Sequence, residues 1–298
     1  MYFYAVKYKK SAILLTFFSL WLSVYFTNPS QVVFALFLIF SLGILHGSND
    51  LLLITKVSKT SKPLQLALFF GSYIGTVIVA SFLFYFVPIF ALAIFILFSS
   101  YHFGEQHWNE LNTKNINFNR LLFLNYGLSV LFLLFALNSE ATLEIIFLLT
   151  GLSFDENWFI WIFTLSIALW LIQMIFMTYR NYISWQNLLF EFFLFLVFAI
   201  VFKTATLIWA FAIYFILWHS IPSIIEQQTF LYGEASTRTF FKYVKSSFLI
   251  WLISISSIFC LFIWLKDEAI LLPLLFAFLG AITFAHSLTI SRMFQTKK

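Results

Sequence analysis

Long apolar runs alternate with short polar segments along the chain and form its dominant pattern. A helix needs about 20 mostly apolar residues to cross a bilayer, within a range of about 17–25. Ten runs approach this length: 11–27, 31–54, 64–86, 88–103, 120–138, 158–178, 186–202, 204–227, 246–265 and 269–291. Since the connecting segments are too short for a soluble domain, the pattern predicts an all-α, polytopic integral membrane helical bundle, with 1–298 as a single transmembrane domain.

The weakest runs leave the number of spans open. Runs 88–103 and 186–202 are short for a span, and merging or discarding weak runs gives eight spans instead of ten. Segment 141–152 is apolar but too short to cross, so we expect an interfacial helix or a re-entrant piece there.

Composition narrows the class of protein. Hydrophobic residues make up 62% of the 298 residues and charged residues 10%, whereas about 25% of an ordinary soluble domain is charged. This excludes a soluble globular protein, because polar side chains are too few to cover its surface. The single cysteine, Cys260, excludes a disulfide framework and a cysteine metal cage. The first run lacks a small-x-small cleavage site, so we expect a retained helix rather than a signal peptide.

Basic residues set the expected orientation. If ten spans alternate from a cytoplasmic N-terminus, 15 of the 17 Lys and Arg residues fall in inner segments, and only Lys203 and Lys266 fall outside. Because basic flanks resist translocation, both termini are expected in the cytoplasm. The net charge of +5 is spread over short loops rather than gathered in one basic stripe, so we expect no nucleic-acid partner.

Histidines are the most informative ionisable residues at membrane depth. Under the expected topology all five fall in the cytoplasmic half of the bundle; they are His46, His102, His107, His219 and His286. A single membrane histidine most often forms a hydrogen bond between helices or lies at the interface. Histidines placed only for such structural reasons have no cause to share one depth, so their common depth favours a shared site.

Two of these histidines are followed by carboxylates at helical spacing. Asp50 comes four residues after His46, and Glu105 comes three residues after His102. If each helix continues, the carboxylate lies on the face of its histidine, where it can accept the second ring N–H of a metal-bound imidazole. The alternative for Asp50 is a partly solvated residue near the interface. Gly104 is expected to end the helix soon after His102.

Pro222 interrupts the run that carries His219. Its nitrogen cannot donate to the carbonyl of Trp218, so the span should kink beside His219. Broken helices are tolerated in lipid mainly where they face protein or a cavity. At helical spacing His219, Ser223 and Glu226 share a face and could all point inward. The alternative is a simple bend with Glu226 already at the cytoplasmic surface.

Several imidazoles that converge without cysteine favour iron, zinc or copper over magnesium or calcium, and imidazole alone does not decide among the three. His286 lies in a stretch of small residues that begins at Gly280 and suits close helix packing. An all-histidine site with open positions, reached sideways from lipid, suits iron and dioxygen chemistry on a hydrophobic molecule.

Four short motifs resemble the bacterial and archaeal Brp/Blh family of membrane-bound β-carotene 15,15′-dioxygenases. They are HGSND at 46–50, YHFGEQHW at 101–108, WHSIPSIIEQ at 218–227 and AHSLTI at 285–290. The resemblance implies a non-haem iron enzyme of the inner (plasma) membrane that cleaves β-carotene with O₂ at its central double bond to give two retinal molecules. It further implies Fe(II) held by His46, His102 and His219, and a microbial rhodopsin as recipient of the retinal.

The fourth ligand departs from the family pattern. Many members carry a second histidine four residues after the one that His219 matches, whereas this chain has Ser223 there. His286 matches a C-terminal family histidine and is the candidate to complete the iron site. His107 stands where relatives often have aspartate, so it is expected either to support the ligands or to replace one. The other residues with this pair of expected roles are Asp50, Glu105, Ser223 and Glu226.

A rod-like hydrocarbon of about membrane thickness never needs to leave the lipid. The substrate that the resemblance implies therefore fits a membrane protein with an apolar tunnel past the metal. Phe103, Trp108 and Trp218 are near the motifs and are expected to line that tunnel.

A transporter or proton-relay protein that uses intramembrane His, Asp and Glu is the alternative of a different class. A relay should continue across the membrane, whereas the outer half of this chain is almost empty of ionisable groups under the expected topology. A bis-histidine haem protein is a further alternative, which a Soret band would reveal. A retinal-binding rhodopsin would need a lysine well inside a span, and a diiron desaturase would need paired histidine boxes; the sequence has neither.

Overall fold

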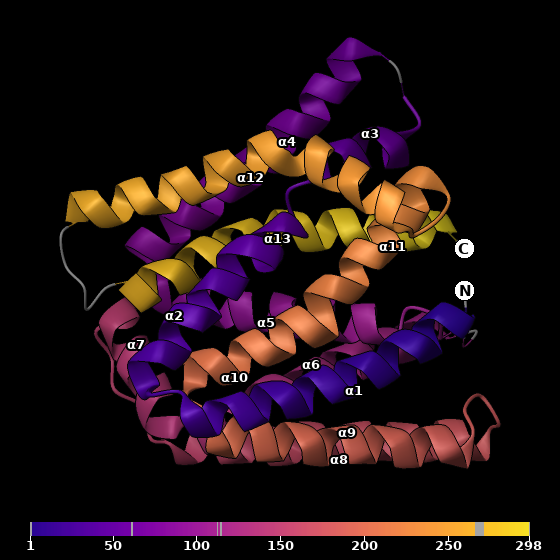
Figure 1. Cartoon of the computed structure of the whole chain (residues 1–298), viewed down its shortest axis with the longest axis vertical. Helices are drawn as coiled ribbons and strands as arrows, with labels where there is room; N and C mark the ends of the chain where they lie inside the picture. Colours follow the sequence, from indigo (N-terminus) through magenta and orange to yellow (C-terminus); the bar gives the residue numbers. More distant parts are fainter. Residues whose placement is uncertain (1, 61, 112, 114, 266–270, 298) are drawn as a thin grey trace.

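The computed structural model describes residues 2–60, 62–111, 113, 115–265 and 271–297, and every regular element within these residues is a helix (Figure 1). The α-helices are α1 (Tyr2–Tyr25), α2 (Asn28–Leu38), α3 (Asp50–Ser58), α4 (Pro63–Phe86), α5 (Pro88–His107), α6 (Ile116–Leu137), α7 (Ser139–Thr150), α8 (Asn157–Tyr179), α9 (Trp185–Thr204), α10 (Leu207–Tyr214), α11 (Ile221–Tyr232), α12 (Thr237–Leu265) and α13 (Leu271–Lys297). Two π-helical segments, η1 (Ile39–Gly43) and η2 (Phe215–Ser220), continue from α2 and α10.

Local sequence signals explain many helix boundaries. Pro63 and Pro88 stand in the first turns of α4 and α5, where a missing N–H costs nothing. The side chain of Asn115 caps α6 by accepting a hydrogen bond from a backbone N–H of its first turn. Gly151 and Gly233 end α7 and α11 with φ of 70° and 88°, a conformation that glycine adopts without strain.

Eight helical segments of the described residues are long and apolar enough to cross a membrane. This confirms the all-α polytopic helical bundle, and it agrees with the lower of the two expected span numbers. Run 11–27 overlaps α1, which ends at Tyr25 and is not among the eight. Run 31–54 is wrong as a continuous span, because η1 ends at Gly43, residues 46–49 form a turn, and a new helix begins at Asp50.

Most other expected runs coincide with helices, with shifted ends. Segment 141–152 forms the short helix α7, and the start of the last run, 269–270, lies outside the described residues. Gly104 does not end α5, which continues to His107. The reason is packing: a Cβ atom at Gly104 would lie 1.9 Å from the carbonyl oxygen of Phe123, so this glycine lets α5 and α6 touch through their backbones.

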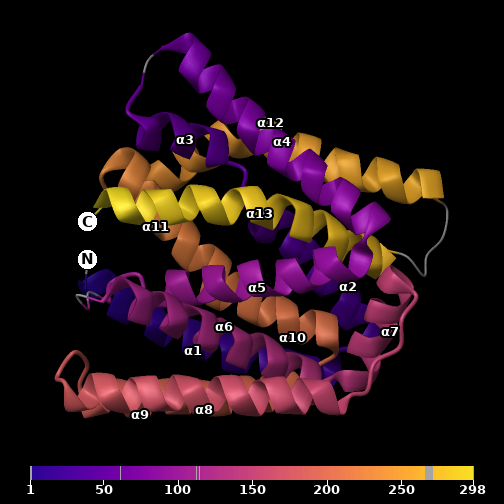
Figure 2. The same cartoon turned by 180° about the vertical axis from the view of Figure 1, so that it is seen from behind.

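The segment from α10 through η2 to α11 passes through the middle of the bundle. Within its most apolar 18-residue window 83% of the residues are buried, against 6% for α4 and 11% for α12. Helices α4 and α12 lie along one edge of the molecule, and α8 and α9 lie along the opposite edge (Figures 1 and 2). Large apolar side chains such as Phe82, Trp161 and Phe248 are exposed on these outer helices, as expected for a multi-pass membrane protein.

The two chain ends lie on the same side of the bundle in both views (Figures 1 and 2). The eight segments run from Pro63 to Thr296, so their even number places residue 63 on the side of the C-terminal end, and it does not by itself place the N-terminal end. The cytoplasmic location of the two ends stays a prediction from the distribution of Lys and Arg.

Candidate metal centre

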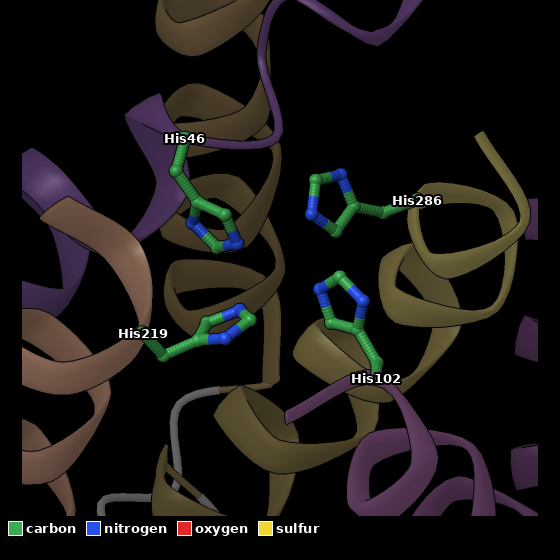
Figure 3. A group of neighbouring side chains, drawn as sticks. All are labelled: His46, His102, His219 and His286. Atoms are coloured by element: carbon green, nitrogen blue, oxygen red, sulfur yellow. The ribbon is translucent and has the colours of Figure 1, made fainter. Parts of the chain in front are cut away.

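Four histidines from four separate segments meet inside the bundle (Figure 3). His46 follows η1, His102 is in α5, His219 is in η2 and His286 is in α13. All four are buried, and one ring nitrogen from each lies within 4.8 Å of those of the other three. Two imidazole nitrogens on opposite sides of one ion, each at about 2.1 Å, would be about 4.2 Å apart. The group therefore needs to contract by no more than about 0.6 Å to surround a single metal ion.

The four rings form a closed square of neighbours. Ring centroids are 4.7 Å apart between His46 and His286, and 5.0 Å apart between His286 and His102. The square closes with 4.7 Å between His102 and His219, and 5.2 Å between His219 and His46. Neighbouring rings meet nearly edge to face, at 78° to 88°, so that they converge on one centre instead of stacking.

Two π-helical segments bring His46 and His219 to this centre. Such segments add a residue to a helical turn and occur frequently at functional sites. Segments η1 and η2 pack against each other, and Gly43 at the end of η1 faces the ring of Phe215 at the start of η2. The expected disturbance near Pro222 is therefore present, as π-helical turns that include His219.

Outer hydrogen bonds fix two of the rings. Nδ1 of His46 donates to the carbonyl oxygen of Gly43. Nδ1 of His286 lies 2.8 Å and 3.0 Å from the two carboxylate oxygens of Asp50. With its Nδ1–H donated outward, each ring presents an Nε2 lone pair for a metal, which is the usual way that outer partners fix the tautomer of a metal-binding histidine.

Several nitrogens of the group have no protein partner within the described residues. These are both ring nitrogens of His102, both of His219, and Nε2 of His286. Buried polar atoms without partners are costly, so a set of them aimed at one point calls for a shared partner. A metal ion bound by neutral imidazoles fits this set, and the absence of cysteine among the four favours iron, zinc or copper.

Asp50 lies beside the centre but supports a different histidine from the one expected. Residues 46–49 form a turn, so the helical spacing from His46 to Asp50 does not hold, and the carboxylate binds His286 instead. The backbone carbonyl of His46 is held separately: Nε2 of Gln227 donates to it at 2.8 Å, and the hydroxyl of Tyr243 lies 3.0 Å from it.

The remaining expected residues lie outside the group of four. Ser223 is buried and accepts a hydrogen bond from Gln227 at 3.0 Å, so it takes part in the support of His46. Glu226 accepts from the amide of Asn109. Glu105 accepts from Ser291 at 2.9 Å and from Tyr101 at 3.3 Å.

His107 belongs to a second buried polar cluster, which joins α1, α5, α6 and α9. Its Nε2 lies 2.9 Å from Oε2 of Glu191, and its Nδ1 lies 3.2 Å from the hydroxyl of Tyr126. Lys9 approaches the same carboxylate at 3.7 Å. Glu191 was missed in the sequence, although an acidic residue inside an apolar run is itself a signal.

A large cavity adjoins the four histidines, which form part of its wall. Its volume is about 1060 Å³, slightly above the range of about 300–1,000 Å³ that is usual for ligand pockets. Apart from the histidines and a few hydroxyl groups, the lining is apolar and comes mainly from α4, α5, α6, α7, α8, α12 and α13. Phe103 lines the cavity as expected, whereas Trp108 and Trp218 are not among its lining residues.

Comparison with known proteins agrees with this geometry. A family model described as beta-carotene 15,15′-dioxygenase matches residues 37–294, which include all four histidines of the centre. No match was found among curated proteins or among solved structures. Since the matched region spans most of the chain, the protein belongs to the β-carotene 15,15′-dioxygenase family.

Proposed function

We propose that the protein cleaves β-carotene with O₂ at its central 15,15′ double bond, at a ferrous ion bound by His46, His102, His219 and His286. The observation that carries the proposal is the convergence of four buried imidazoles in the wall of a large apolar cavity. Membership of the family supplies the substrate, and the chemistry of the donor set is compatible with iron.

The four histidines are held in place in two ways. His46 and His286 are oriented by Gly43 and Asp50, whereas His102 and His219 are held by the packing of α5 and η2. When bound, the iron supplies the ability to bind and activate O₂. The protein contributes a neutral ligand set, open to the cavity and away from bulk water.

The cavity explains how an apolar rod can reach the centre. Its lining residues include residues of α4 and α12, which lie at one edge of the bundle, and residues of α8, which lies at the other (Figure 1). Ile74, Ile78 and Ile253 line it and are also about half exposed at the outer surface. Substrate would therefore enter sideways from the lipid, without passing through water.

The reaction balances without an external reductant. The central carbon–carbon double bond breaks, and each of its two carbons receives one oxygen atom of O₂, which gives two retinal aldehydes. The side chains need only orient the substrate, exclude water and hold the ion, which is consistent with the scarcity of acid–base groups among the lining residues.

Retinal formation in cells tests the proposal. The chain and its His46→Ala variant would be expressed in a bacterial host that accumulates β-carotene, with iron and oxygen supplied, and the extracts separated by chromatography. His107→Gln is the matched control, because His107 lies outside the group of four. We expect retinal from the unmodified chain and from the control, normalised to protein amount, and none from His46→Ala. Persistent β-carotene without aldehyde, despite folded protein, would contradict central cleavage.

The cellular setting follows from the same proposal. We place the protein in the inner (plasma) membrane with both termini in the cytoplasm, and a microbial rhodopsin is the proposed recipient of the retinal. The alternative of a transporter or proton relay is less favoured, because the matched family is one of enzymes and the histidines form one compact group.

A further inference from the structure

Tyr73 contacts Asp50, the partner of His286, from a helix that is otherwise mostly exposed. It lies on α4, which carries none of the four histidines and packs against α13, the helix of His286. Tyr73 is half-buried and forms part of the cavity wall. No sequence motif marked this residue, so the role argued below depends on the tertiary structure alone.

The hydroxyl of Tyr73 is a partner of the carboxylate that holds His286. It donates to Oδ2 of Asp50 at 2.8 Å, while Nδ1 of His286 contacts both oxygens of the same carboxylate. Asp50 is buried, and a buried carboxylate needs donors for both oxygens to stay in one orientation. Tyr73, Asp50 and His286 thus form a continuous chain of hydrogen bonds from the cavity wall to the centre.

We propose that Tyr73 is a positioning residue, which fixes the Asp50 carboxylate and thereby holds the His286 ring with Nε2 toward the metal. The inference rests on the proposed function, since it takes His286 as a ligand. Without the tyrosine hydroxyl the carboxylate can rotate, and the His286 ring loses part of its orientation. The phenyl ring of Tyr73 has a separate task, because it supplies apolar surface to the cavity.

The two tasks can be separated by one substitution. Tyr73→Phe removes the hydroxyl and keeps the ring, so the cavity wall is preserved. Outer partners of metal-binding histidines typically contribute about 10–100-fold to metal affinity, and we expect a loss of about 3–10-fold for a partner one bond further out. The KM for β-carotene should stay within about twofold, because the wall is unchanged.

The test measures Co(II) affinity of the full chain in detergent, by competition with a chromogenic chelator, together with the Co(II) d–d absorption band. Tyr85→Phe is the matched control, since Tyr85 is on the same helix, is 80% exposed and does not line the cavity. We expect weaker binding and an altered band for Tyr73→Phe, and neither change for Tyr85→Phe. Thermal unfolding of each variant reports whether the fold is kept.

A double-variant comparison decides whether Tyr73 acts through Asp50. In an Asp50→Ala background, or in a His286→Ala background if the first is unstable, adding Tyr73→Phe should cause no further loss of affinity. The role of Tyr73 would be overturned if Tyr73→Phe left the Co(II) affinity and the absorption band unchanged. It would also be overturned if the losses of affinity were additive in these backgrounds. Either result would leave the proposed iron site intact. Failure of the unmodified chain to bind Co(II) or Fe(II) would overturn both proposals.

Discussion

Replacing Gly104 by alanine tests how the contact between α5 and α6 determines the metal centre. A Cβ atom at residue 104 would lie 1.9 Å from the carbonyl oxygen of Phe123 and 2.5 Å from its carbonyl carbon. Real Cβ contacts are essentially never shorter than 3.0 Å, so the backbones must move apart by more than 1 Å. The obstacle is backbone and cannot be relieved by a change of rotamer.

The same contact is reinforced from the partner helix. A Cβ atom at Gly127 of α6 would lie 1.8 Å from the carbonyl oxygen of Ser100 in α5. Gly104 of α5 thus faces Phe123 of α6, and Ser100 of α5 faces Gly127. Ser100 and Gly104 have the four-residue spacing of small residues that is common in close membrane-helix pairs. His102 lies between the two contact points, so a displaced α5 carries this ligand with it.

We expect Gly104→Ala to destabilise the protein by at least about 1–3 kcal/mol, the usual range for overpacking a tight interior. Metal content should fall with it, because ligand sites tolerate displacements of only about 0.5 Å. Gly75→Ala is the control: it is also in a helix, but its Cβ atom would meet nothing within 4 Å. Alanine there should raise stability by about 0.5–1 kcal/mol through helix propensity.

Thermal unfolding in detergent and metal analysis of the purified protein would measure both effects. The reasoning is refuted if Gly104→Ala unfolds at the temperature of the unmodified chain and retains full metal content. It is also refuted if Gly75→Ala causes an equal loss of unfolding temperature and metal content, since any added methyl group would then have the same effect.

Three further results are expected. Ser254→Phe on α12 should raise the KM for β-carotene several-fold with unchanged metal content, because Ser254 lines the cavity, whereas Ser256→Phe on the exposed face should leave KM unchanged; steady-state kinetics would distinguish them. Glu191→Leu should lower stability by about 1–3 kcal/mol, because His107 loses a buried partner, without changing the Co(II) d–d band; a changed band would place this cluster at the metal centre. Prolonged treatment with an iron chelator should abolish retinal formation, and Fe(II) should restore it to the unmodified chain but not to His286→Ala; restoration in that variant would exclude His286 as an essential ligand.

Much of the architecture could be predicted from the apolar runs. Lipid imposes a length and an internally bonded backbone on any spanning segment, so runs such as 120–138 and 158–178 closely match α6 and α8. The predictions failed where packing overrides composition. The run 31–54 is broken at residues 46–49, and α5 continues through Gly104, because contacts with other helices decide both points.

The metal centre was partly predictable for a similar reason. His46, His102, His219 and His286 are rare polar residues in apolar runs, and such residues are retained in lipid only with partners. Their partners could not be predicted from spacing. Asp50 follows His46 in the sequence yet binds His286, and His107 lies five residues after His102 yet binds Glu191.

By itself the sequence determined that the protein is a helical membrane bundle with a small set of buried histidines, since composition and run length follow from the solvent that surrounds the chain. Only the tertiary structure decided which hydrogen bonds orient the four histidines, and that Tyr73 and Asp50 connect the cavity wall to one of them. Those features depend on contacts between helices far apart in the sequence, and a residue's periodicity within its own helix does not determine its distance from another helix.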